Sequence, residues 1–143
     1  MPPTLLLVED SPGDAGLLAE ALSETSDPPQ VVRAGDGQEA WEMVQRFLAG
    51  PPAERPVLMV LDIGLPGDTG LDVLERIRND APAADWPMVM LTSSMSPRDV
   101  ERARGARAAG YFAKPVTLDG YLELAKVLHE RFLRPTRVPP TTA

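Results

Sequence analysis

Residues 57–67 read VLMVLDIGLPG, and this stretch decides the fold. An unbroken apolar run that stops at a carboxylate, followed by Gly and Pro, is typical of a strand buried on both faces of a parallel sheet. The functional crevice of such a sheet lies at the carboxyl ends of its strands. Asp62, directly after the run, is therefore the first candidate functional residue.

The same pattern recurs along the chain on both sides of this stretch. Further apolar runs stand at residues 5–8 and 88–91, and shorter ones, suited to the flanks of a sheet, at 31–32 and 111–112. Helical patterns alternate with these runs at about 13–24, 37–49, 70–79, 97–109 and 118–134. Because the connections are too long for hairpins, the alternation predicts an α/β fold: a doubly wound parallel sheet with helices on both faces.

Composition narrows the function. The 143 residues suit one domain, for which we expect residues 1–134, with 135–143 as a proline-rich C-terminal tail. A net charge of −7 disfavours nucleic acid as a direct partner. The absence of cysteine excludes thiolate catalysis, disulfides and Cys-ligated metals. No apolar run is long enough for a membrane span and the first residues lack a basic signal-peptide start, so a cytoplasmic protein is expected.

Polar side chains follow four of the predicted strands. They are Glu9 and Asp10 after the first, Asp62 after the third, Thr92 after the fourth, and Lys114 with Pro115 after the fifth. Since these strand ends meet at one edge of the sheet, we expect three carboxylates, a hydroxyl and an ammonium to converge there.

This combination favours phosphoryl chemistry. Three crowded carboxylates raise one another's pKa unless a cation neutralises them, and Mg²⁺ is the hard cation that suits oxygen ligands and a phosphoryl oxygen. Asp62 could then act as the nucleophile toward phosphorus. Thr92 and Lys114 could hold the other phosphoryl oxygens.

At this point the sequence resembles a known family, the receiver domains of two-component response regulators, typified by the chemotaxis response regulators. The resemblance covers nearly the whole chain and implies a flavodoxin-like sheet of five strands in the order 2-1-3-4-5 with five helices. It rests on the motifs Leu7-Val8-Glu9-Asp10, Val60-Leu61-Asp62-Ile63-Gly64-Leu65-Pro66, Leu91-Thr92-Ser93 and Tyr111-Phe112-Ala113-Lys114-Pro115.

The resemblance also implies roles for these residues. It implies a signalling protein, not an enzyme, in which Asp62 accepts a phosphoryl group from a histidine kinase. Asp10, Asp62 and the backbone carbonyl of Gly64 would ligate Mg²⁺, with Glu9 acting mostly through water. Thr92 and Tyr111 look like the switch pair, and the Lys114–Pro115 bond looks like a cis peptide.

A narrower resemblance comes from residues 8–14, VEDSPGD, which look most like the single-domain regulators that partner bacterial phytochromes. Two positions depart from the family pattern, Gly64 and Ser94, which stand two residues after Asp62 and Thr92. In the family, side chains at these positions tune how fast water attacks the aspartyl phosphate. Here neither side chain is large or charged, so the resemblance leaves the lifetime of an aspartyl phosphate open.

Each residue also has a simpler interpretation. Glu9 and Asp10 could cap a helix, Asp62 and Thr92 could belong to turns, and Tyr111 could be a core aromatic. Lys114 is harder to dismiss as a surface cation, because the chain uses twelve arginines and only two lysines.

Two other functions remain as alternatives. A pseudo-receiver, which binds partners without phosphorylation, would be expected to have lost one of the charged positions. A phosphatase of the haloacid dehalogenase type would carry an Asp where this chain has Gly64. A mononucleotide binder is disfavoured because no glycine-rich phosphate loop opens the first helix.

Two helices suggest how a signal could leave. The helix at 97–109 has little to bury besides Val100 and alanines, so it should be weakly held, with i,i+4 charge pairs on its solvent face. The helix at 118–134 has an apolar arc wider than sheet packing needs. We therefore expect a homodimer through a patch of Leu124, Val127 and Leu128, unless the C-terminal tail covers that patch.

Overall fold

The computed structural model describes residues 2–93 and 95–134, so Ser94 and the predicted tail lie outside the described residues. A parallel sheet of five strands forms the centre, in the order β2-β1-β3-β4-β5. The predicted fold and strand order are thus confirmed. The strands are β1 (Thr4–Val8), β2 (Gln30–Ala34), β3 (Leu58–Asp62), β4 (Met88–Thr92) and β5 (Gly110–Ala113).

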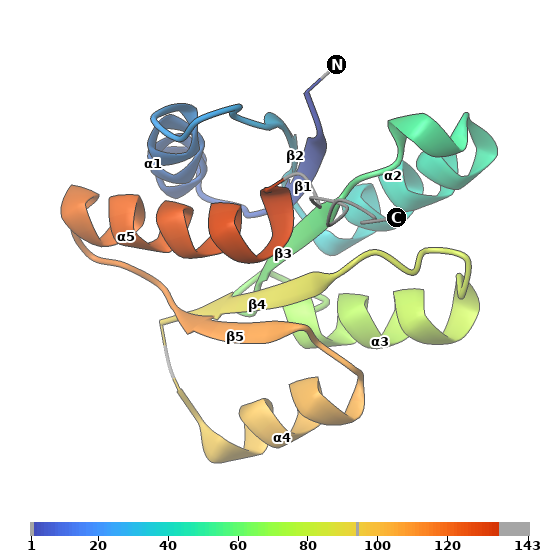
Figure 1. Cartoon of the computed structure of the whole chain (residues 1–143). Coiled ribbons are helices and arrows are strands. Elements are labelled where there is room, and N and C mark those ends of the chain that lie inside the picture. The colour runs from blue at the N-terminus through green and yellow to red at the C-terminus, as the bar shows by residue number, and fades with distance from the viewer. Residues whose placement is uncertain (1, 94, 135–143) are drawn as a thin grey trace, which may run out of the picture.

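Helices cover both faces of this sheet (Figure 1). They are α1 (Pro12–Ser23), α2 (Gly37–Ala49), α3 (Gly70–Asp80), α4 (Pro97–Gly105) and α5 (Leu118–Leu128), with a short 3₁₀ turn at Pro52–Glu54. Figure 1 shows α1 and α5 together on one face and α2, α3 and α4 on the other. Among the described residues, no helix has the length and apolarity needed to cross a membrane.

The alternation of side chains along the strands separates two cores. Leu6, Met59 and Met90 point toward α2 and α3, whereas Leu5, Val60 and Leu91 point toward α1 and α5. Because β3 and β4 are buried along their whole length, they read as unbroken apolar runs. Asp62 and Thr92 are the last residues of these two buried strands, so the burial fixes their positions at the carboxyl edge of the sheet.

The predicted helix at 97–109 ends earlier than its sequence pattern suggests, and the one at 118–134 keeps its length but changes from α-helix to π-helix near its end. α4 stops at Gly105 because Arg107 adopts φ = 62°, a left-handed conformation that a right-handed helix cannot contain. α5 continues past Leu128 as a π-helical turn at His129–Leu133, where the N–H of Arg134 bonds the carbonyl of His129.

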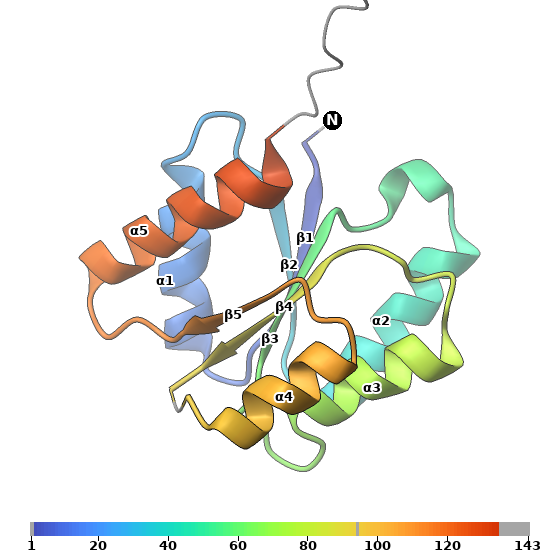
Figure 2. The same cartoon turned by 60° about the horizontal axis from the view of Figure 1, so that its bottom comes forward.

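The predicted dimer patch is wrong in two of its three residues. Leu124 and Leu128 are buried, and only Val127 is exposed. The arc is wide because α5 packs against α1 as well as against the sheet, as Figure 2 also shows. A wide apolar stripe on this helix therefore marks two internal neighbours and leaves little surplus surface.

Candidate functional site

Backbone pairing brings the predicted residues to one edge. The N–H of Glu9 bonds the carbonyl of Ala34 at 3.0 Å, and the N–H of Ile63 bonds that of Leu91 at 3.0 Å. The N–H of Lys114 bonds the carbonyl of Thr92 at 2.6 Å. These backbone hydrogen bonds therefore hold the carboxyl ends of neighbouring strands together at the positions of the predicted polar residues.

Lys114 is the centre of the site. Its ammonium lies 2.7 Å from Glu9 Oε1, 2.9 Å from Asp14 Oδ2 and 3.0 Å from Asp62 Oδ2. Glu9 directly follows β1, Asp14 lies in α1 and Asp62 ends β3, so none of the three acids is adjacent to Lys114 in the sequence. Sequence reasoning placed Glu9 and Asp62 here, but it assigned no role to Asp14.

The carboxylates form a cluster suited to a cation. Ligand oxygens of Glu9, Asp10 and Asp62 all lie within 4.8 Å of one another. Hard carboxylate oxygens at this spacing fit Mg²⁺. Asp62 is oriented from its own loop, because the N–H of Gly64 donates to Asp62 Oδ1 at 2.9 Å. The Gly64 carbonyl as a further ligand stays a prediction.

The burial of these charges has electrostatic consequences. Burial, helped by nearby Asp62, raises the pKa of Glu9 to about 7, against the opposing hydrogen bond from Lys114. Burial alone would lower the pKa of Lys114, but its hydrogen bonds to Glu9, Asp14 and Asp62 outweigh that effect and raise it. Lys114 therefore stays protonated, whereas the protonation state of Glu9 depends on the positive charge beside it.

Two residues that sequence reasoning missed hold the backbone of the site. Arg33 on β2 donates from Nε to the carbonyl of Glu9 at 2.9 Å and from a terminal nitrogen to that of Asp10 at 3.1 Å. Gly70, at the start of α3, packs directly on the backbone of Asp62. Neither has a local sequence signal, because each acts through a contact distant in the chain.

The proposed switch residues lie beside the charged cluster. Thr92 is buried at the end of β4, and Tyr111 is half-buried on β5. Burial raises the pKa of the Tyr111 phenol, the charge of Asp99 on α4 adds to the effect, and the Thr92 side chain opposes it. Tyr111 thus stands between the site and α4.

The expected cis peptide is absent. All peptide bonds of the described residues are trans, including Lys114–Pro115. Trans is the ordinary form of an X–Pro bond, and in it the ammonium of Lys114 already reaches Asp62.

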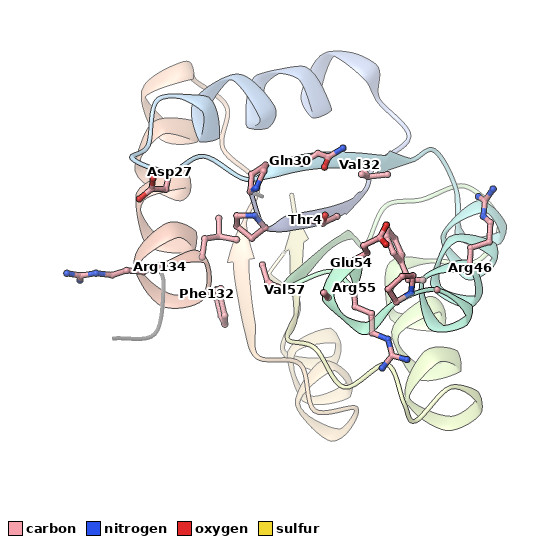
Figure 3. Close-up of a pocket in the computed structure, with 17 residues that line it drawn as sticks. Thr4, Asp27, Gln30, Val32, Arg46, Glu54, Arg55, Val57, Phe132 and Arg134 are labelled. Carbon is pink, nitrogen blue, oxygen red and sulfur yellow. The ribbon is translucent and has the colours of Figure 1, made fainter. Parts of the chain in front are cut away.

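A cavity of about 670 Å³ lies away from this chemistry. It opens at the amino ends of the strands, where Thr4, Gln30 and Val57 line it together with Phe132 (Figure 3). Because Asp62 lies at the carboxyl end of β3, the cavity and the acidic cluster occupy opposite ends of the sheet.

Comparison with known proteins gives the same assignment as the geometry. The response regulator receiver domain family matches residues 5–126. Response regulator Rcp1 of Synechocystis is 28% identical over 138 residues, which covers 96% of this chain and 94% of the relative. The probable transcriptional regulatory protein TcrX of Mycobacterium tuberculosis is 33% identical over 120 residues, and there the match spans 46% of the relative's length.

Solved structures agree in shape as well. The phosphorylated cyanobacterial phytochrome response regulator RcpA has a TM-score of 0.82 and 30% identity, covering 94% of this chain and 96% of that one. The Mn²⁺-bound form of Rcp1 has a TM-score of 0.81 and 28% identity, covering 96% and 99%. Because the family match spans residues 5–126 and the fold agrees with these solved structures, the chain belongs to the response regulator receiver domains.

Proposed function

We propose that this protein is a single-domain response regulator whose Asp62 accepts a phosphoryl group from a phosphohistidine of a sensor kinase. The observation that carries the proposal is the ammonium of Lys114 at 3.0 Å from Asp62 Oδ2, beside a cluster of three carboxylates. A structural carboxylate would be satisfied by one cation. The additional acids leave more negative charge than one ammonium neutralises, which supports binding of a divalent cation and, beside that cation, of a phosphoryl group.

The reaction is a displacement at phosphorus. An oxygen of Asp62 forms a bond to phosphorus while the bond from phosphorus to the kinase histidine breaks, and the histidine leaves with its electron pair. Gly64 orients Asp62 through its N–H. The ammonium of Lys114 lies close enough to Asp62 to donate a hydrogen bond to an oxygen of the transferred phosphoryl group. Thr92 would donate its hydroxyl to another of them.

Glu9, Asp10, Asp62 and the Gly64 carbonyl would hold Mg²⁺. When bound, the ion supplies positive charge to the phosphoryl oxygens of the donor. The Mn²⁺-bound structure of Rcp1 shows that a relative binds a divalent cation.

The signal would leave through α4. Only Ala103 of this helix is buried, so the core anchors it weakly. Thr92, Tyr111 and Asp99 form a path from the site to its first turn. A phosphoryl group that draws Thr92 toward itself would free the space that Tyr111 can enter and shift α4 at small cost.

The partners proposed here follow from the relatives. RcpA is described as a phytochrome response regulator, which favours a phytochrome-type kinase as the donor. The acidic chain favours another protein over nucleic acid as the receiver of the signal. A homodimer through the outer face of α5 stays part of the proposal, with Val127 as its exposed apolar residue.

The test is labelling by acetyl phosphate with and without Mg²⁺, followed by intact mass. We expect one phosphoryl group per chain that requires Mg²⁺. Mass is a better readout than tryptophan fluorescence, because Trp86 is buried just before β4, at the opposite end of that strand from Thr92. A protein that takes no label with Mg²⁺ present would instead be the pseudo-receiver.

A further inference from the structure

Asp14 is a third carboxylate on the nitrogen of Lys114. Its Oδ2 lies 2.9 Å from Nζ, and its side chain is 39% exposed, whereas those of Glu9 and Asp62 are 2% and 7% exposed. An ammonium has three N–H groups, so in this state each is directed at a different carboxylate. Asp14 occupies the solvent side, apart from the cluster suited to a cation.

The start of α1 fixes this placement. Ser11 caps the helix, and its hydroxyl accepts the N–H of Asp14 at 3.2 Å. The N–H of Ser11 in turn donates to Glu9 Oε2 at 3.2 Å. The same capping turn therefore sets the positions of both Glu9 and Asp14 relative to Lys114.

This arrangement matters once a phosphoryl group is present. A phosphoryl oxygen can gain a hydrogen bond from Lys114 only when one carboxylate gives up its share. Asp14 does not react, and nothing in the proposed transfer removes it from the ammonium. The positive charge of Lys114 is then divided between the phosphoryl group and Asp14, whose own negative charge also opposes an incoming anion.

We propose that Asp14 is a positioning residue for phosphoryl transfer, which holds the ammonium of Lys114 at the outer side of the site and so weakens its hold on a phosphoryl group at Asp62. This inference rests on the proposed function. Asp14 is the fourth acid of the site, and it would affect the bound phosphoryl group only through its ion pair with Lys114.

The decisive comparison is between Asp14→Asn and Asp14→Glu. Asn keeps an oxygen that can accept from Lys114 but removes the charge, whereas Glu keeps the charge. Asp119→Asn is the matched control, because Asp119 is also an exposed acid in the first turn of a helix, α5, and its loss changes the net charge equally. Any change in beryllofluoride affinity that comes only from losing a negative charge at a helix N-terminus should therefore appear in Asp119→Asn as well.

Two measurements then separate positioning from a structural role. The first is the affinity for beryllofluoride, a phosphoryl mimic, with Mg²⁺ by calorimetry. The second is the ¹⁵N-lysine NMR spectrum without Mg²⁺, in which the chain's two lysines give one reporter each. Lys126, paired with Glu123 on the surface of α5, is the internal standard.

Asp14→Asn should bind beryllofluoride about threefold to tenfold more tightly, the effect of removing one partly screened charge at short range. It should also shift the Lys114 resonance and leave that of Lys126 in place. Asp14→Glu and Asp119→Asn should stay within about twofold of wild type. Unchanged or weaker binding by Asp14→Asn, or an equal gain in Asp119→Asn, would overturn the proposal. A wild-type protein that binds no beryllofluoride and takes no label would overturn the proposed function, and this inference with it.

Discussion

Gly70 packs directly against the main chain of Asp62, so closely that a Cβ at position 70 would collide with the Asp62 carbonyl. The N–H of Gly70 also donates to the carbonyl of Ile63 at 3.3 Å. The first residue of α3 therefore supports the loop that carries the proposed phosphoacceptor. Only a residue without a side chain allows this approach.

Gly70→Ala should therefore displace the Asp62 backbone and slow labelling by acetyl phosphate at least about tenfold while lowering the melting temperature. Gly16→Ala is the matched control, because a Cβ there, inside α1, meets open space. That control should label normally and gain roughly 0.5–1 kcal/mol of stability from its better helix propensity. Normal labelling by both variants would show that the contact does not position Asp62.

Arg102 is the polar link that holds α4 to α3. It donates from Nε to Glu75 at 2.9 Å and from a terminal nitrogen to Asp72 at 2.6 Å. Since the core anchors α4 only through Ala103, Arg102→Ala should increase amide exchange throughout α4 and leave α3 protected. Arg104→Ala, which removes only the i,i+3 pair with Glu101, should change exchange little. Equal exchange in the two variants would contradict this account.

The titration of Glu9 predicts how stability varies with pH without Mg²⁺. Burial raises the pKa of Glu9 from 4.5 to about 7 in the folded protein, so between these values the folded state binds more protons than the unfolded state. The free energy of unfolding should therefore fall as the pH rises through this interval. In Glu9→Gln the part of this pH dependence that comes from Glu9 should be absent, as measured by urea unfolding at pH 5 and pH 8. Parallel pH dependence in the two proteins would exclude Glu9 as its source.

Substitutions on the buried and exposed sides of α5 should differ in their effect on stability. Leu128 is fully buried between α1 and the sheet, so Leu128→Ala should cost about 2–5 kcal/mol of stability. Val127 is exposed, so Val127→Glu should leave stability nearly unchanged and dissociate a dimer if the outer face of α5 forms one. Sedimentation decides the second part: a wild-type monomer of 15.4 kDa, with and without phosphorylation, would contradict the dimer.

The sequence predicted the fold because β1, β3 and β4 are buried on both faces. Burial on both faces leaves an apolar run that ends where the sheet ends, and the polar residue that follows is then placed at the functional edge. Glu9, Asp62 and Lys114 could therefore be brought together from residues far apart in the chain.

What the sequence could not predict depends on contacts between elements. Gly70 and Arg33 support the site through backbone groups, which leave no pattern of side-chain types. The width of the apolar arc on α5 was interpreted as a surface patch because periodicity cannot tell a second internal neighbour, α1, from an external one. The end of α4 was missed because the left-handed conformation of Arg107 has no signal in a residue of that type.

The central claim is that Asp62 is the residue that receives the phosphoryl group. The most direct measurement is acetyl phosphate labelling of wild type, Asp62→Asn and Asp68→Asn with Mg²⁺, followed by intact mass and peptide mapping. Asp68 is an exposed carboxylate in the same loop, so it controls for the loss of one negative charge nearby. We predict a phosphoryl group on residue 62 in wild type and Asp68→Asn, and no label on Asp62→Asn. Labelling of Asp62→Asn at the wild-type rate would contradict the account.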